Sequence, residues 1–315
     1  MDSTRQRLQV LVTGRDGQVG WELKHALASL GDVIAVSRSE MDLASAESMR
    51  NCIRASRPNL IVNAAAYTAV DKAESEPELA HRINADAVAV IAEEAKQIGA
   101  VVIHYSTDYV FDGAKATPYF EEDPTNPLSV YGKTKFASEN ALANAGIPYL
   151  VLRTSWVYGM RGKNFLLTIL KLAAEKPELR IVADQTGAPT SSRDIAAVTA
   201  AIAERWLLDE QRNPRALDCL RANSGIYHMT SAGETTWYGF AAEALRLHAA
   251  KYVGEPAQMA RLIPIPASEY PTPAARPKNS RLDCSKLARI FDVNLPEWRA
   301  SLSEVLRRVN TTDVG

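Results

Sequence analysis

A tyrosine and a lysine stand four residues apart in the segment Tyr131-Gly132-Lys133-Thr134-Lys135. On a helix this spacing puts both side chains on one face, whereas Lys133 points elsewhere. A phenol with a pKa of about 10 is a poor acid–base group at neutral pH, and an adjacent ammonium lowers that pKa by stabilising the phenolate. The pair therefore predicts proton transfer to or from a substrate oxygen, with Tyr131 as the acid–base group.

A hydroxyl group precedes this pair, in Ser106-Thr107-Asp108. The apolar run Val101–Tyr105 before it predicts a strand, and reactive groups gather past the carboxyl ends of strands in a parallel α/β sheet. Thr107 there can hydrogen-bond the same substrate oxygen as the tyrosine. Thr107, Tyr131 and Lys135 thus form a predicted carbonyl-reducing triad.

Three glycines, Gly14, Gly17 and Gly20, lie between an expected strand, Leu8–Thr13, and an expected helix, Gln18–Leu30. A tight turn needs residues that tolerate positive φ, and close approach of the backbone to a pyrophosphate needs the absence of a Cβ. The helix N-terminus adds free N–H groups and the positive end of its dipole. The spacing GxxGxxG differs from the usual GxGxxG and on its own is compatible with simple turn chemistry. After the first strand of an α/β pattern it predicts a dinucleotide site.

The end of the second expected strand, Ala35-Val36-Ser37-Arg38, indicates the form of the cofactor. An NAD site usually carries Asp or Glu here, to bind the ribose 2′-OH. A hydroxyl and a guanidinium suit a 2′-phosphate, so NADPH is favoured over NADH, which stays open. Arg15 in the glycine turn can add a second cationic contact. The alternative is that Arg15 and Arg38 are solvated surface arginines.

Short apolar runs alternate with helix-like segments through the first half of the chain. The other strands expected there are Val33–Val36, Leu60–Asn63 and Tyr149–Thr154, and the other helices are Ala44–Ser56, Leu79–Ile98 and Tyr131–Asn144. Strand–helix–strand repetition with all-apolar strands indicates a parallel sheet covered on both faces. We therefore expect an α/β fold with a doubly wound, Rossmann-type sheet.

This rhythm breaks after Gly159. We expect helices over Asn164–Glu175, Asp194–Leu208, Thr235–Leu247, Ser285–Phe291 and Trp298–Val309, and strands over Leu179–Val182 and Gly225–Met229. Recurrent proline between Leu262 and Pro277 predicts an extended, pocket-lining loop. The predicted dinucleotide-binding domain is 1–160 with 193–231, and a smaller interleaved C-terminal substrate domain takes 161–192 with 232–315.

Composition excludes several classes of protein. The 315 residues are 46% hydrophobic and 23% charged, which is close to the globular average. With 36 Lys and Arg against 37 Asp and Glu, the net charge of −1 argues against nucleic acid and anionic membrane as partners. Three cysteines (Cys52, Cys219, Cys284) and five histidines show no metal-ligand spacing. The polar start MDSTRQ and the lack of a long apolar stretch predict a cytoplasmic protein.

A resemblance adds to these separate signals. In order, GQVGWEL, AAYTAVDKAE, STDYVFDG, PLSVYGKTK, LRTSWVYG, DQTGAPT and RPKNSRL resemble the dTDP-4-dehydrorhamnose reductase family of the extended short-chain dehydrogenases, over about Leu8 to Arg308. The resemblance implies NADPH-dependent reduction of the C4 ketone of a nucleotide sugar, dTDP-4-dehydro-L-rhamnose. In these expected roles Tyr131 protonates the new alkoxide, Lys135 adjusts the pKa of Tyr131, and Thr107 orients the carbonyl.

The expected binding residues follow from these motifs together. For the cofactor they are Gly14, Arg15, Gly17, Gln18, Val19, Gly20, Ser37, Arg38, Asp42, Leu43, Ala64, Ala65, Ala66, Tyr131 and Lys135. For the substrate they are Thr107, Asp108, Tyr109, Val110, Phe111, Trp156, Asn279 and Arg281. An indole face suits a sugar and a guanidinium suits a diphosphate. The alternatives are a core tryptophan at Trp156 and a surface salt bridge at Arg281.

The residues around the predicted triad also bear on related activities of similar proteins. Nucleotide-sugar 4,6-dehydratases carry an Asp-Glu pair after the active-site threonine, because elimination needs its own acid and base. Here Asp108-Tyr109 follows Thr107, so the glutamate is missing. A 4-epimerase would share the triad, although the whole-chain likeness favours the reductase. The non-catalytic regulatory β subunit of methionine adenosyltransferase resembles the same fold, and the intact triad argues against that role.

Some members of the family are described as homodimers bridged by Mg²⁺ on glutamates. Glu22 matches the first such position. The segment Ser191-Ser192-Arg193-Asp194 has an arginine where an acidic side chain would help. We therefore predict no metal site, while Mg²⁺ and a homodimer stay open.

Overall fold

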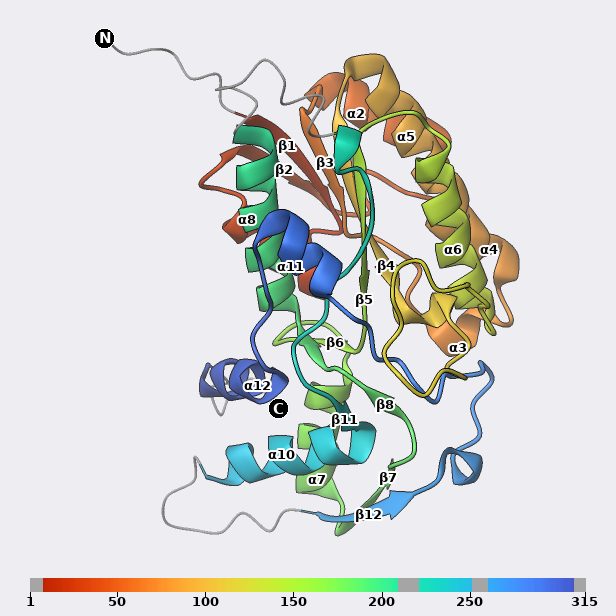
Figure 1. Ribbon diagram of the computed structural model, residues 1–315, viewed down its shortest axis with the longest axis vertical. Coiled ribbons are helices and arrows are strands. Elements are labelled where there is room, and N and C mark those ends of the chain that lie inside the picture. Colours follow the sequence, from red (N-terminus) through yellow and green to blue (C-terminus); the bar gives the residue numbers. More distant parts are fainter. Residues whose placement is uncertain (1–7, 209–220, 251–259, 309–315) are drawn as a thin grey trace.

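The computed structural model describes residues 8–208, 221–250 and 260–308 (Figure 1). Its centre is a six-stranded sheet of order β10-β5-β4-β3-β1-β2, with every pairing parallel. The strands are β1 (Leu8–Thr13), β2 (Gly31–Val36), β3 (Leu60–Asn63), β4 (Val101–Thr107), β5 (Tyr149–Thr154) and β10 (Gly225–His228). Because β2 and β3 flank β1, the strand order reverses there, which is where doubly wound sheets bind ligands. The predicted α/β doubly wound fold is confirmed.

Helices cover both faces of this sheet (Figure 1). Alternate strand residues point to opposite faces, so Val10 and Val12 join one apolar cluster and Leu11 joins another. The first cluster is covered by α1 (Gln18–Ala26), α8 (Ser192–Leu208) and α11 (Ser285–Phe291). The second is covered by α2 (Ala46–Ser56), α5 (Ala87–Ile98) and α6 (Val130–Ala143). Burial on both faces explains why the strand sequences are continuously apolar.

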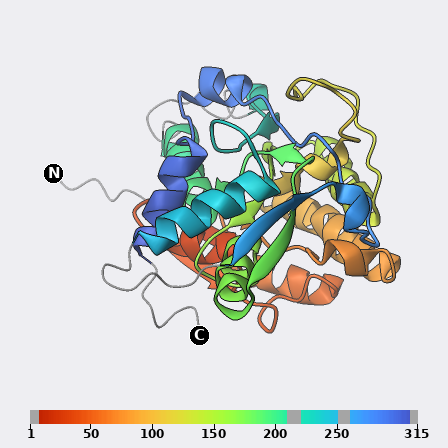
Figure 2. The same cartoon turned by 90° about the horizontal axis from the view of Figure 1, so that it is seen from below.

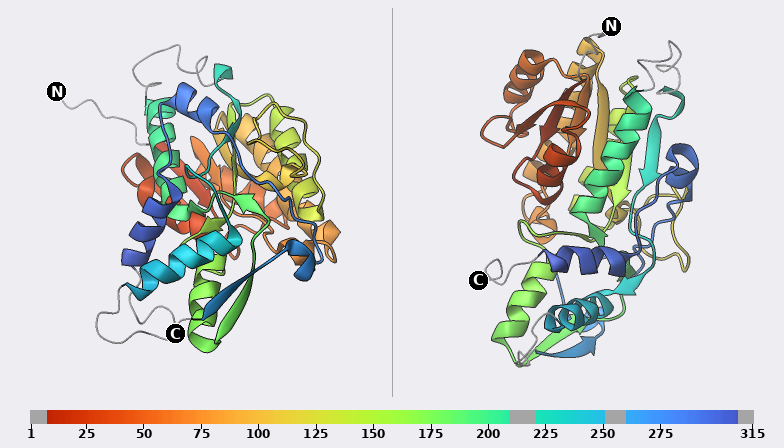
Figure 3. Two further views of the ribbon diagram at one scale, coloured as in Figure 1. Left: turned by 60° about the horizontal axis from the view of Figure 1, so that its bottom comes forward. Right: turned by 90° about the vertical axis from the view of Figure 1, so that its left-hand side faces the viewer.

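A second group of elements packs below the carboxyl edge of the sheet (Figures 2 and 3). It consists of α7 (Phe165–Glu175), α10 (Trp237–Ala249), α12 (Trp298–Arg307) and the parallel pair β7 (Glu178–Val182) and β12 (Arg261–Ile265). Its own apolar cluster includes Phe240 and Trp298. Helix α11, in contrast, packs its Leu287 and Phe291 against the sheet. The domain boundaries stay a prediction, and residues 1–7, Cys219 and Val309 lie outside the described residues.

Short elements connect these groups. They are α3 (Val70–Ala73), α4 (Pro77–His81), the single turns η1 (Arg82–Asp86), η2 (Asp108–Val110) and η3 (Ala267–Glu269), and the paired strands β6 (Val157–Tyr158) with β9 (Thr190–Ser191) and β8 (Thr186–Gly187) with β11 (Thr235–Thr236). Within the described part of the chain, no helix has both the length and the apolar character to cross a bilayer.

The helix predicted over Leu79–Ile98 is in fact interrupted. Between α4 and α5 the turn η1 is π-helical. The side chain of Asn84 in this turn accepts from the N–H of Tyr67, donates to the carbonyl of Tyr67 and donates to Thr134 on α6. A widened turn of this kind is frequent near functional sites. Here it fastens the loop after β3 to α6, a contact that helical periodicity does not reveal.

Two other predictions in the second half were wrong in part. The proline-rich stretch begins not as a loop but as β12, which pairs with β7 through Pro264 and Ile181. A two-stranded ribbon leaves each strand one open edge, where the missing N–H of proline is tolerated. The helix expected from Thr235 starts at Trp237, because Thr235 pairs in β11 and the Thr236 side chain caps α10 by accepting from Gly239.

A buried ion pair joins α6 to the sheet. Arg153 on β5 donates to both carboxylate oxygens of Glu139, at 2.9 and 2.7 Å, and Ser106 donates to the same carboxylate at 2.5 Å. Both charged side chains are almost fully buried. Such a pair holds two elements in register only while both partners are present.

We therefore expect Arg153→Met to lower the free energy of unfolding by about 3 to 5 kcal/mol, because it leaves a buried carboxylate unpaired. Urea denaturation measures this change. The control is Arg299→Ala, which removes an exposed pair with Glu297 and should leave the denaturation midpoint nearly unchanged. Equal midpoints for the two variants would contradict this assignment.

Candidate active site and cofactor cavity

The glycine turn joins β1 directly to α1. Gly14 has φ +74°, in the left-handed region that favours glycine. A Cβ on Gly20 would lie 2.1 Å from the carbonyl oxygen of Gly14, so this glycine lets α1 pack against the turn. A Cβ on Gly14 would lie 3.1 Å from the backbone of Ala65, in the loop after β3. The three segments therefore meet with no space for side chains between them.

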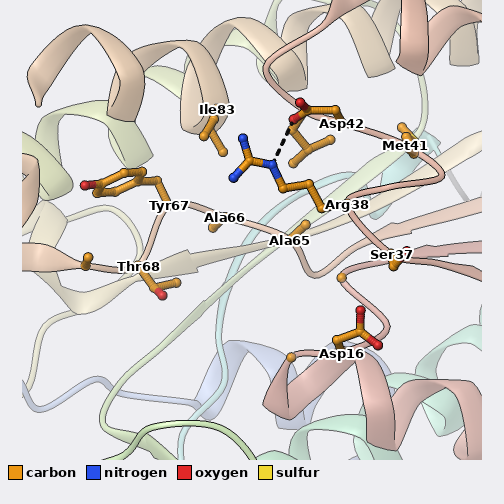
Figure 4. A pocket seen from close by; sticks show the side chains of 14 residues that line it. Asp16, Ser37, Arg38, Met41, Asp42, Ala65, Ala66, Tyr67, Thr68 and Ile83 are labelled. Carbon is orange, nitrogen blue, oxygen red and sulfur yellow. Dashed lines mark ion pairs between the residues drawn. The ribbon is translucent and has the colours of Figure 1, made fainter.

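A cavity of about 380 Å³ opens where β1, β2 and β3 end (Figure 4). Among the predicted cofactor residues it is lined by Gly14, Gly17, Ser37, Arg38, Asp42, Leu43, Ala65 and Ala66. It is also lined by Asp16, Met41, Tyr67, Thr68, Ala69 and Ile83, which sequence reasoning missed. Most of these neighbour the predicted residues in the chain. Ile83 comes from the π-helical turn and carried no sequence signal.

The cavity has features that fit the phosphate-bearing end of a dinucleotide. Its volume lies within the usual range for small-molecule sites. Helix α1 starts at its edge, and the helix N-terminus has no side-chain cap to occupy its N–H groups. Gly14 and Gly17 supply bare backbone on the same wall.

Other predicted cofactor residues lie beside this cavity. The Oε1 atom of Gln18 accepts a hydrogen bond from Asn164, the N-cap residue of α7, at 2.9 Å. Val19 and Ala64 pack against the apolar cluster under the sheet. These side chains support the turn from behind.

The two predicted cations differ in how they are paired. Arg15 donates to Glu40 and to the carbonyl of Ala35, and its guanidinium lies 3.0 Å from the second Glu40 oxygen. That same oxygen accepts from the N–H and the hydroxyl of Ser37, both at 2.8 Å. These contacts, led by the Ser37 N–H, hold the pKa of Glu40 below its usual range. Arg15 and Ser37 are therefore already bound to a carboxylate that sequence reasoning missed.

Arg38 is placed differently. Its side chain is 77% exposed and lies across the cavity, with its Nε 3.5 Å from Asp42 (Figure 4). A guanidinium with this exposure can still take a phosphate. Of the two predicted cations, Arg38 is thus the better placed for a ligand in the cavity.

Helix α6 approaches the end of β4 very closely. A Cβ on Gly132 would lie 2.3 Å from the carbonyl oxygen of Tyr109 in η2, so only glycine allows this approach. Ser129 caps the helix by accepting from the N–H of Gly132. The contact brings Tyr131 close to Thr107, which is buried at the end of β4.

The pKa of Tyr131 is raised in this geometry, whereas the lysine alone was expected to lower it. The pKa of Tyr131 is raised to about 12, mainly by burial and also by the charge of Asp108, while an interaction with Thr107 opposes both. The Nζ of Lys135 lies 3.1 Å from Nε2 of His104. The loss of hydration therefore outweighs any lowering of the phenol's pKa by the ammonium, and Tyr131 stays protonated at neutral pH.

Lys135 is itself perturbed. Only 2% of its surface is exposed, and burial lowers its pKa to about 7 while Glu139, one turn along α6, raises it. Lys133, on another face of the helix, is exposed. The spacing of four correctly placed Lys135 with Tyr131, and a lysine near pKa 7 can give or take a proton at neutral pH.

The residues after Thr107 have separate environments. Asp108 is buried and accepts from the Thr107 hydroxyl at 3.0 Å, and burial raises its pKa to about 6. Tyr109 packs edge-on against Tyr131, with ring centroids 5.6 Å apart. Val110 and Phe111 are buried in a small apolar cluster with Tyr119. Of the predicted substrate residues in this segment, Asp108 and Tyr109 adjoin the triad and the next two support it from behind.

Trp156 has a strained backbone and a stacked side chain. Its φ is +47°, and its ring stacks on Trp237 of α10 at 3.6 Å between centroids. Gly187 approaches the indole so closely that a Cβ there would lie 2.7 Å from it. A bulky residue at positive φ is frequent at functional sites. One indole face is covered by Trp237, a partner that sequence reasoning missed.

Asn279 and Arg281 are engaged within the protein. Asn279 donates to the carbonyls of Lys115 and Thr117, and its Oδ1 accepts from Arg281. Arg281 also donates to Glu234 at 2.9 Å. These contacts match the salt-bridge alternative for Arg281 and fasten the C-terminal segment to the loop after η2.

The positions weighed for a metal show no ligand group. Arg193 donates to Glu304 at 3.1 Å. Glu22 is half-buried on α1. Within residues 8–208, 221–250 and 260–308, no three His, Cys, Asp or Glu side chains gather as a metal site would require.

Comparison with known proteins places the chain in a family. The model of the RmlD substrate binding domain matches residues 8–311. A dTDP-4-dehydrorhamnose reductase of Burkholderia thailandensis is 46% identical over 300 residues, which are 95% of this chain and 98% of that protein.

Solved structures agree with this match. A dTDP-4-dehydrorhamnose reductase of Clostridium acetobutylicum has a TM-score of 0.83 and 35% identity, with 95% of this chain and 98% of that one covered. One of Bacillus anthracis, in complex with NADP, has a TM-score of 0.82 and 29% identity, with 96% and 100% covered. The chain belongs to the dTDP-4-dehydrorhamnose reductase family.

Proposed function

We propose that this protein reduces the C4 ketone of dTDP-4-dehydro-L-rhamnose to the alcohol of dTDP-L-rhamnose, with NADPH as the reductant. NADPH, when bound, supplies the hydride that adds to the carbonyl carbon. Tyr131 donates the phenolic proton to the carbonyl oxygen, and Thr107 hydrogen-bonds the same oxygen. Lys135 then returns a proton to the tyrosine. The relatives at 46% and 35% identity, both dTDP-4-dehydrorhamnose reductases, support the choice of substrate.

The observation that carries this proposal is the position of Tyr131, partly buried beside Thr107 at the end of β4, with a pKa raised by loss of hydration. A general acid must hold its proton until the substrate oxygen becomes basic. Burial raises the pKa of Tyr131 to about 12, so the group is fully protonated in the free protein at neutral pH. An alkoxide formed by hydride addition is a stronger base than phenolate and takes this proton.

The buried lysine complements this acid. After proton donation the phenolate is stabilised by a neighbouring ammonium and is then reprotonated. Lys135 lies one turn from Tyr131 on the same helix face, and its pKa of about 7 suits a group that exchanges protons at neutral pH. The pair therefore supports a reaction that consumes one proton in each turnover.

The cavity supports NADPH in particular. Ser37 and Arg38 stand at the end of β2, where a ribose 2′-phosphate would lie in a doubly wound fold. The relative of Bacillus anthracis is in complex with NADP. We assign the 2′-phosphate to Arg38 before Arg15, because Arg15 is already paired with Glu40.

On the substrate side we keep Asp108, Tyr109 and Trp156 as residues near the sugar. Asn279 and Arg281 have an indirect role, because they hold the C-terminal segment against the loop after η2. The residue directly after Asp108 is Tyr109 and not a glutamate, which favours simple reduction over dehydration. Oxidation of NADPH by purified protein, with the ketosugar as substrate, is the first test. Turnover of another nucleotide ketosugar in place of this one would overturn the assignment, and no reduction at all would favour a binding role.

Tyr131→Phe removes the proposed acid and keeps the ring. We expect kcat to fall by at least about a hundredfold, because general acid catalysis contributes at this scale. NADPH affinity, measured by fluorescence titration, should stay within about twofold. The control is Tyr227→Phe: Tyr227 lies on β10, and its hydroxyl donates to the carbonyl of Asn223, which precedes that strand. Near-normal kcat in Tyr131→Phe would refute the acid role.

Arg38→Ala tests the cofactor assignment. The loss of a charge-assisted contact should raise the KM for NADPH at least about tenfold and leave the KM for NADH nearly unchanged. Arg15→Ala is the matched variant, and it should have the smaller effect on NADPH because Glu40 already compensates Arg15. Steady-state kinetics with both cofactors measures the difference. If Arg38→Ala changed both KM values equally, Arg38 would not read the 2′-phosphate.

A further inference from the structure

A buried histidine lies behind the proposed catalytic lysine. His104 is on β4, is 1% exposed, and none of the reaction steps described above uses it. Its Nε2 lies 3.1 Å from Nζ of Lys135 and 3.0 Å from the hydroxyl of Ser138, both on α6. Its Nδ1 lies 3.1 Å from Nδ2 of Asn63 at the end of β3. Both ring nitrogens are therefore bound.

The chain of hydrogen bonds continues to the glycine turn. The carboxamide oxygen of Asn63 accepts from the hydroxyl of Thr13 at 2.6 Å. That hydroxyl accepts from the N–H of Ala65 at 3.1 Å. At the other end, Ser138 donates to the carbonyl of Lys135 at 2.5 Å. The lysine is thus connected to two segments that line the cofactor cavity.

The donors and acceptors in this chain allow two arrangements of protons. If Lys135 is an ammonium, it donates to Nε2, so the imidazole proton is on Nδ1 and Asn63 must turn its oxygen toward the ring. If Lys135 is a neutral amine, Asn63 donates to Nδ1, and the Nε2 proton is shared by Ser138 and the amine. Every ring nitrogen has a partner in both arrangements. The tautomer of His104 therefore follows the charge of Lys135.

The surroundings keep the imidazole itself uncharged. Burial and the charge of Lys135 hold the pKa of His104 well below its usual range. Among the described residues, the ionisable groups beside Lys135 are His104 from β4 and, one turn away on its own helix, Tyr131 and Glu139. The negative charge of Glu139 is compensated by Arg153 from β5. An uncharged acceptor can stabilise a buried ammonium without adding a second buried charge.

We propose that His104 is a positioning residue for Lys135: it holds the lysine amine against β4, and its tautomer switches as the lysine gains or loses its proton. This inference rests on the proposed function, because it gives Lys135 a role in proton balance. It adds that β3 and β4, through Asn63 and His104, determine where that amine lies and how readily it is protonated.

The tautomer switch can be measured without any reaction. In the full chain labelled with ¹⁵N-histidine, the signals of His104 are the ones among five histidines that disappear in His104→Gln. Nitrogen shifts distinguish the two neutral tautomers from imidazolium. Between about pH 5.5 and 9, we expect His104 to stay neutral and to pass from the Nδ1–H form to the Nε2–H form, with a midpoint near pH 7. One unchanged tautomer, or a titration to imidazolium, would overturn the proposal.

Kinetic variants give an independent readout. In His104→Leu the ammonium loses its acceptor, so the basic limb of the kcat/KM profile should move about one unit toward lower pH. In His104→Gln, whose carboxamide can accept from an ammonium or donate to an amine, the limb should return close to its original position. A merely structural histidine would change the stability of both variants and leave the limb in place, which would contradict the inference. If His104→Leu does not fold, His104→Gln and the tautomer measurement decide.

The control is Tyr105→Phe, on the same strand. Tyr105 is buried on the opposite face of the sheet, and its hydroxyl binds Thr199 on α8 at 2.7 Å. Removing that hydroxyl perturbs β4 without touching the lysine, so the pH profile should not move. A shift as large as that of His104→Leu would overturn the specific role of His104.

Lys135→Met separates this inference from the proposed function. If this variant keeps its reductase activity, the proposed role of the lysine fails. If its His104 signals still switch between tautomers near pH 7, the coupling proposed here fails, whatever the activity.

Discussion

The contact between α6 and β4 is the constraint on which the whole site depends. Helices usually pack on sheets through apolar side chains, yet here α6 turns Tyr131, Lys135, Ser138 and Glu139 toward the strand. On the strand side they meet Thr107, His104 and Ser106, and Arg153 closes the row from β5. A polar contact of this kind is stable only when nearly every group has a partner, because each unpaired buried group is costly. Gly132 permits the close approach at the N-terminal end of α6.

Burial in this contact shifts the proton equilibria of Tyr131 and Lys135 in the directions that the proposed chemistry requires. The same loss of hydration raises the pKa of the phenol of Tyr131 and lowers that of the amine of Lys135. Tyr131, the proposed acid, therefore keeps its proton at neutral pH, and Lys135 becomes able to exchange one. A separate compensation operates beside the cofactor cavity, where Glu40 neutralises Arg15, whereas Arg38 on the cavity wall stays exposed.

Much of this architecture was predictable from local pattern. Continuous apolar strands indicated a sheet covered on both faces, and glycines after β1 indicated a tight turn at its carboxyl edge. The spacing of Tyr131 and Lys135 sufficed to place both on one helix face, since a helix repeats every 3.6 residues.

What could not be predicted depends on partners distant in sequence. The raised pKa of Tyr131 was not predicted, because it depends on burial and on the charge of Asp108, more than twenty residues away. The pairing of Arg15 with Glu40 and the stacking of Trp156 on Trp237 also join distant segments. The π-helical turn at Asn84 is held by hydrogen bonds with Tyr67 and Thr134, and hydrophobic periodicity gives no sign of these bonds.

The measurement that tests this account most directly is the titration of Tyr131 in the free protein. With ¹³C-tyrosine labelling, the carbon bonded to the hydroxyl reports the phenol and phenolate forms. Because burial raises the pKa of Tyr131 to about 12, its signal should stay constant while exposed tyrosines titrate near their usual pKa of 10.0. A phenolate that forms close to neutral pH, before any ligand is added, would contradict the claim that the α6–β4 contact keeps Tyr131 protonated until the substrate binds.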